Sequence, residues 1–167
     1  MLPDVMLPDS ERMVFLPQGI TGFWFYKDPP PPSTDERDFS AYCHTAARRL
    51  RGSVIAKELA TEHYPQNFSV ITVQLPYETV AILLNAQFPM IAMAQPIFEH
   101  EMTLSFIDVP ALADEFRKFG CYYIFSASEL AQPITDETLS DLSDAEINQI
   151  EYWKPSAIGE LIFNFWD

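Results

Sequence analysis

The chain has 167 residues, of which 48% are hydrophobic and 14% aromatic, and its 24 acidic and 10 basic residues give a formal net charge of −14. This length suits one domain with a sizeable core, and the hydrophobic content excludes disorder for most of the chain. The acidic balance argues against binding to nucleic acid or to anionic membranes, because both require a basic surface.

The first residues carry aspartates and prolines where a signal peptide would need a basic start and an apolar run, so we expect a cytoplasmic protein. Leu-Pro-Asp occurs twice within residues 1–10, and prolines this close suggest a loosely held arm before one globular domain over residues 11–167. Cys43 and Cys121 have no metal or redox spacing. We expect both to be small buried hydrophobic residues in a reducing compartment.

The N-terminal third predicts two short strands and one helix. Residues 13–16 and 20–26 have the composition of strands separated by a turn at 17–19, and the prolines at 29–32 form a stiff connector. A helix is expected near 34–51, because Ser33 and Glu36 have capping-box spacing, apolar residues recur with helical period and Gly52 follows. Residues 53–59 are a further strand candidate.

The longest apolar stretch, residues 68–94, is expected to form the centre of the fold. β-Branched residues are concentrated between Phe68 and Leu75, as the pleated surface of a sheet favours, and predict a strand that ends at Pro76. Residues 80–84 predict a second strand, with a helix from Glu78 to Gln87 as the alternative, and residues 88–94 predict a third. Two prolines and three polar residues interrupt the stretch, so it is not expected to span a membrane.

The C-terminal half alternates between strands and helices. Strands are expected at 103–107 and 121–125, on either side of a helix near 109–119 that Asp108 caps and Gly120 ends; whether the two strands pair in parallel is left open. Ser143 and Glu146 form a capping box for a helix near 144–153. The pattern predicts an α+β fold, with a central, mainly antiparallel sheet and about three helices packed against it.

The tail at 156–166 fits a helix and a strand equally well. Because it is apolar and aromatic, it must pack into the core or onto a partner, and it is a candidate oligomer contact.

No local motif for catalysis, a metal or a cofactor is present. The sequence lacks a phosphate loop, a dinucleotide fingerprint, a nucleophile elbow and a metal-spaced cysteine–histidine set, so none of these sites is predicted. The cluster 99–101 (Glu-His-Glu) is interpreted as a solvated edge or loop, because neighbouring strand residues point apart. Cys43 and His44 diverge by about 100° on a helix and are interpreted as packing residues. The arginines within 48–51 are expected to pair with the excess acids.

The segment between Phe119 and Trp153 contains no basic residue, and its acidic residues run from Glu129 to Glu151. A solvated face is one interpretation. The other is a docking surface for a basic protein, in which acids steer the partner and an aromatic residue anchors it. The expected docking residues are Glu129, Asp136, Glu137, Asp141, Asp144, Glu146 and Trp153.

In composition alone, a small acidic chain of this kind resembles bacterial toxin-immunity proteins, and the resemblance implies capture of a basic protein partner. The alternative is a small-molecule binding domain or an enzyme whose site assembles from scattered residues. A subunit of a larger assembly, held by the apolar tail, is a third interpretation.

Overall fold

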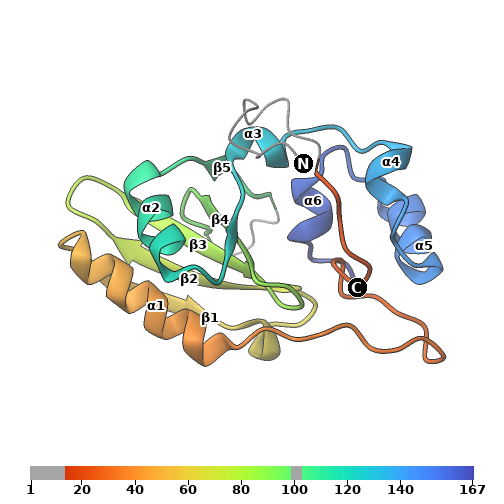
Figure 1. Cartoon of the computed structure of the whole chain (residues 1–167), viewed down its shortest axis with the longest axis horizontal. Coiled ribbons are helices and arrows are strands. Elements are labelled where there is room, and N and C mark those ends of the chain that lie inside the picture. Colours follow the sequence, from red (N-terminus) through yellow and green to blue (C-terminus); the bar gives the residue numbers. More distant parts are fainter. Residues whose placement is uncertain (1–13, 99–102) are drawn as a thin grey trace.

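The structure is a computed structural model that describes residues 14–98 and 103–167, and it has the predicted α+β architecture (Figure 1). The sheet order is β1-β2-β3-β4-β5, and β6 pairs with β4. The strands are β1 (Ser53–Glu58), β2 (Phe68–Gln74), β3 (Thr79–Asn85), β4 (Met90–Ala94), β5 (Phe106–Ile107) and β6 (Tyr123–Ile124).

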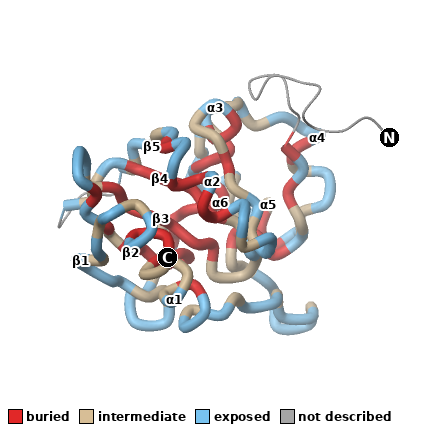
Figure 2. The backbone as a smooth tube through the Cα atoms, turned by 60° about the vertical axis from the view of Figure 1, so that its left-hand side comes forward, coloured by how far each residue is buried: buried red, intermediate tan, exposed pale blue. Residues whose placement is uncertain are grey.

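Strands β1 to β4 form an antiparallel meander from the apolar stretch that the sequence singled out. All residues of β3 except Thr79 are buried, because both faces of the sheet are covered at its centre (Figure 2). β3 pairs with β2 over seven positions, so the alternative of a helix from Glu78 to Gln87 is wrong.

Helices α1 (Glu36–Arg49) and α2 (Pro110–Phe119) cover one face of the sheet, where Phe39 and Phe116 pack on β2, β3 and β4. α1 begins two residues later than predicted, because its cap is Asp35, whose carboxylate accepts the Asp38 N–H at 2.9 Å. The predicted Ser33 capping box is therefore wrong.

Asp108 is not the cap of α2 either. Val109 occupies the cap position, and the Asp108 carboxylate accepts the Ala127 N–H at 2.9 Å instead. Gly120 ends α2 as predicted, with a left-handed φ of 74°.

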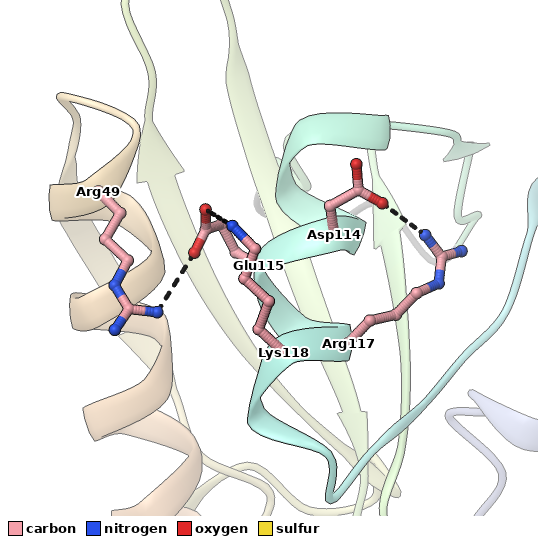
Figure 3. A network of polar contacts seen from close by, with 5 residues as sticks. All are labelled: Arg49, Asp114, Glu115, Arg117 and Lys118. Atoms are coloured by element: carbon pink, nitrogen blue, oxygen red, sulfur yellow. Dashed lines mark hydrogen bonds and ion pairs between the residues drawn. The ribbon is translucent and has the colours of Figure 1, made fainter.

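An ionic network joins these two helices (Figure 3). Arg49 on α1 reaches Glu115 on α2 at 3.4 Å, and Lys118 reaches the same carboxylate at 3.0 Å. The hydrogen bond from Lys118 is the main cause that lowers the pKa of Glu115. The expectation that the arginine cluster pairs with acids therefore holds for Arg49.

The opposite face of the sheet is covered by segments from both ends of the described chain. Leu16 and Ile20 meet Leu161 and Phe163 there, and all four are buried. Around them lie α3 (Ala127–Leu130), α4 (Asp136–Leu139), α5 (Asp144–Trp153) and α6 (Gly159–Ile162). The short helix η3 (Ala60–Glu62) lies instead beside the start of α1, where the Glu36 carboxylate accepts the Thr61 N–H at 3.1 Å.

The tail is one helical turn, α6, followed by residues without regular structure, so neither predicted alternative describes all of it. It packs into the core of its own chain, and it therefore gives no support to an oligomer contact.

Strands were expected at 13–16 and 20–26, and residue 13 lies outside the described residues. Residues 14–16 and 20–26 form turns and loops and no strand. Three buried asparagines explain the difference. Asn67 and Asn85 both donate to the carbonyl of Ile20, and Asn164 donates to the carbonyl of Thr21, so side-chain amides replace a sheet ladder.

The strands expected at 103–107 and 121–125 are reduced to the two-residue β5 and β6, because both pair with the same edge of β4. β5 is antiparallel to β4 and β6 is parallel to it, so they are not partners of each other.

Cys43 is buried as expected, whereas Cys121 is exposed, which corrects its assignment. The cluster 99–101 lies outside the described residues. None of the described helices is long and apolar enough to cross a membrane.

Candidate functional site

Five exposed carboxylates gather on and around α4 and α5, at the end of the molecule away from α1 and α2 (Figure 1). We call these residues the acidic end: Asp136, Glu137, Asp141, Asp144 and Glu151. Within the described parts of the chain, none of them forms an ion pair. No basic side chain of residues 14–98 and 103–167 therefore neutralises their charge at ion-pair distance.

Most of the basic residues lie elsewhere, although Lys154 is the C-cap of α5 and Lys27 follows Tyr26. Seven of the ten belong to α1, α2, β1 and the turn after α1: Arg37, Arg48, Arg49, Arg51, Lys57, Arg117 and Lys118. Among the described residues, most basic side chains are therefore found around the two sheet-covering helices, and acidic side chains predominate at the acidic end. A surface on which one sign of charge predominates sets up a potential that attracts a molecule of the opposite sign.

Two of the predicted docking residues are buried and are excluded from this surface. Glu129 is 1% exposed, and its carboxylate accepts the Tyr123 hydroxyl and, at 2.9 Å, the Ser126 N–H. Glu146 is fully buried. Both are the third residue of a helix that begins with a capping box, a position whose side chain turns back to the helix start.

Glu146 also fixes a distant loop to the start of α5. Its carboxylate accepts the Gly19 N–H at 2.8 Å, the Thr21 N–H at 3.1 Å and the Thr21 hydroxyl at 2.7 Å, besides the Ser143 N–H at 3.1 Å. The loop that contains residues 19–21 is therefore held against the first turn of α5. The capping spacing was visible in the sequence, but its long-range partners were not.

An exposed aromatic tip follows this loop, and its first residue lies near the start of α5. Trp24, Phe25 and Tyr26 are 47%, 45% and 88% exposed, and we call these three residues the aromatic tip. Trp24 and Ser143, the residue before Asp144, line the same hollow of about 160 Å³. Sequence reasoning missed this tip, because it placed these residues in a strand with one buried face.

The other end of α5 is aromatic as well. Trp153 is 38% exposed, and its ring lies parallel to that of Trp166, with 6.4 Å between centroids and 3° between planes. Tyr152 is 76% exposed, with its ring centroid 5.2 Å from that of Trp153. Of the predicted docking residues, Asp136, Glu137, Asp141, Asp144 and Trp153 are exposed and lie on α4, α5 and the turn between them.

The described residues hold no group of three or more His, Cys, Asp or Glu side chains that could bind a metal ion. Burial raises the pKa of the Cys43 thiol and lowers the pKa of His44. Because the thiolate is the reactive form of cysteine, a buried thiol with a raised pKa is a packing residue and a poor nucleophile.

No protein-family model, curated protein or solved structure matches the chain.

Proposed function

We propose that this protein binds a basic protein partner through the acidic end and the aromatic tip. The observation that carries the proposal is the closeness of the two: Trp24 of the aromatic tip lines a hollow together with Ser143, the residue before Asp144, and the exposed carboxylates on and around α4 and α5 form no ion pair within the described residues. A role of the immunity type, in which a small acidic protein holds a basic one, fits this arrangement.

Each feature has a separate task in such an interface. Acidic side chains at a rim raise the association rate of a basic partner and set its orientation. Aromatic side chains, Trp and Tyr above all, are enriched among the residues that carry most of the binding energy. A surface with only the acids would attract basic molecules without selecting one, and the aromatic tip supplies the contact area that a selective interface needs.

The test is a charge reversal at the acidic end with a matched reversal elsewhere. The double variant Asp141→Lys/Asp144→Lys changes the net charge by +4, and so does the control Glu58→Lys/Glu78→Lys, whose acids are exposed on and beside the β1–β2–β3 sheet. The wild-type protein is first used to isolate a basic partner from lysate of the source cells at low salt. The affinity of that purified partner for each variant is then measured by calorimetry.

We expect the variant at the acidic end to bind at least tenfold more weakly, because reversal turns attraction into repulsion, and each factor of ten corresponds to about 1.4 kcal/mol. The control variant should lose much less affinity, because its substitutions change only the long-range part of the electrostatic field at the acidic end. Equal losses for the two variants would reject the acidic end as the docking surface. Urea unfolding of both variants establishes that they remain folded.

A pocket lined by Gln87 and Trp166 supports the second candidate function, binding of a small molecule. This pocket has a volume of about 310 Å³, and the Gln87 side-chain oxygen in its wall is buried and accepts no hydrogen bond from the described residues. Other polar side chains of the wall, such as Asn67 and Asn164, are already engaged in the core. Native mass spectrometry of protein from the source cells tests this candidate, since a retained small mass that is lost in Gln87→Met would support it.

A further inference from the structure

Four consecutive prolines, Pro29 to Pro32, connect the aromatic tip to α1 along the outside of the molecule (Figure 1). A proline fixes its own φ at about −65° and restricts the residue before it to extended ψ values. A run of prolines therefore adopts the polyproline II helix, which has three residues per turn. Such a segment is a semi-rigid rod and not a flexible linker.

Burial along the segment repeats with the period of this helix. Asp28, Pro31 and Thr34, which are three residues apart, are each half-buried. The residues between them are all exposed: Pro29, Pro30, Pro32 and Ser33. One edge of a three-sided rod thus lies on the protein, and the other two edges face solvent.

The edge on the protein is fixed in place. Pro31 packs so closely on Gly19 that a Cβ added to the glycine would lie 2.7 Å from the proline Cβ. Thr34 donates its N–H to the Ala86 carbonyl at 2.8 Å and its hydroxyl to the Asn85 carbonyl at 2.9 Å. A segment that is already ordered in this way loses little conformational entropy when a partner binds to its free edges.

We infer that the two exposed edges of Pro29–Pro32 are a ligand for a protein domain whose groove is lined with aromatic side chains, as in SH3, WW and EVH1 domains. Such grooves bind proline-rich segments because the polyproline II helix is preformed. Pro29 and Pro32 lie on the same exposed edge, with the Pro-x-x-Pro spacing that these grooves recognise. The inference does not depend on the proposed function, because it uses neither the acidic end nor the aromatic tip.

Purified SH3, WW and EVH1 domains are the probes, and an oligoproline peptide is the competitor. Binding of each domain to the wild-type protein is measured by calorimetry, without and with the competitor. The same titrations are made on Pro29→Ala/Pro32→Ala, which removes both rings of one exposed edge and leaves Pro31 in place. Pro76→Ala/Pro110→Ala is the matched control, because these two prolines are exposed but have no proline neighbour.

We expect at least one of the three domains to bind the wild-type protein about tenfold more tightly than Pro29→Ala/Pro32→Ala, because the variant loses ring contacts at the centre of the interface. The control variant should bind that domain as the wild type does. The oligoproline peptide should displace the wild-type protein from the domain, since both occupy the same groove.

The inference is overturned if none of the three domains binds the wild-type protein more tightly than Pro29→Ala/Pro32→Ala. It is also overturned if the oligoproline peptide fails to displace the wild-type protein, and this competition needs no variant, so it decides the question even if the double variant does not fold. A role as a stiff connector alone predicts a different pattern, in which the double variant is less stable in urea but binds each domain as the wild type does.

Discussion

Glu146 determines how the acidic end and the aromatic tip are joined, so its conversion to glutamine is the most informative single change. The side chain is fully buried, and its two oxygens accept hydrogen bonds from Gly19, Thr21 and Ser143. In Glu146→Gln, one oxygen becomes an NH₂ group that must face donors. The arrangement that costs the least free energy turns this NH₂ group toward Thr21. The Thr21 hydroxyl can rotate to accept a hydrogen bond from it, but the buried Thr21 N–H loses its acceptor.

The magnitude follows from these bonds. A buried donor without a partner costs about 1–3 kcal/mol, and the remaining bonds lose the extra strength of a charged acceptor. We therefore expect Glu146→Gln to lower the free energy of unfolding by about 2–4 kcal/mol. For a chain of this length, 1 kcal/mol corresponds to about 2–4 °C in Tm, so the melting temperature should fall by about 4–16 °C.

The assay is urea unfolding followed by circular dichroism, with Glu151→Gln as the control. Glu151 lies on the same helix and is exposed, so its change removes the same charge and should alter stability by no more than about 0.5 kcal/mol. If the two variants differ by less than about 0.5 kcal/mol, the hydrogen bonds of Glu146 do not fix the loop to α5, and the joined surface of acids and aromatics loses its structural basis.

Two further predictions concern the sheet and its helices. Because the hydrogen bond from Lys118 lowers the pKa of Glu115, the stability that this carboxylate contributes is present above the ordinary glutamate pKa and is lost as pH falls through the lower folded-state pKa. Glu115→Gln should therefore be less stable than the wild type at neutral pH and should approach the wild type in acid. Urea unfolding at several pH values measures this, and a pH-independent difference in the free energy of unfolding between the two proteins would contradict it. A Cβ on Gly52 would lie 2.3 Å from the Gln74 carbonyl oxygen, whereas a Cβ on Gly120 would meet nothing within 4 Å. Because the φ of Gly120 is +74°, Gly120→Ala should lower the free energy of unfolding by about 1–2 kcal/mol, and Gly52→Ala should lower it by clearly more. Thermal unfolding of the two variants tests this ranking, and equal losses of stability would be evidence against it.

The centre of the fold could be predicted because it depends on local patterns. The concentration of β-branched residues located β2, and Pro76 located its end within one residue. The capping box at Ser143 located the start of α5. In each case the deciding residues are neighbours in the sequence, so a single chain contains the whole signal.

The segments that sequence reasoning misplaced are held by partners far along the chain. Residues 14–34 contain strand-like runs, but Asn67, Asn85 and Asn164 occupy their carbonyls at 20 and 21 from more than 40 positions away. Likewise, β5 and β6 are short because they divide one edge of β4 between them. Side-chain hydrogen bonds of this kind have no period, and competition for a strand edge leaves no trace in the composition of either segment.

In the acidic segment, fewer acidic residues are exposed on the surface than the sequence contains. Glu129 and Glu146 contribute to the number of acidic residues but are buried, and both follow a serine by three residues, so the capping spacing identifies them without the structure. When these two buried residues are excluded, the exposed acidic residues that remain are those of the acidic end. Their burial also explains why that set is well placed: Glu129 fixes the start of α3, and Glu146 fixes the loop before the aromatic tip to α5. Acids and aromatics on a support that is already ordered lose less conformational entropy when a partner binds, and this favours their use as a docking surface.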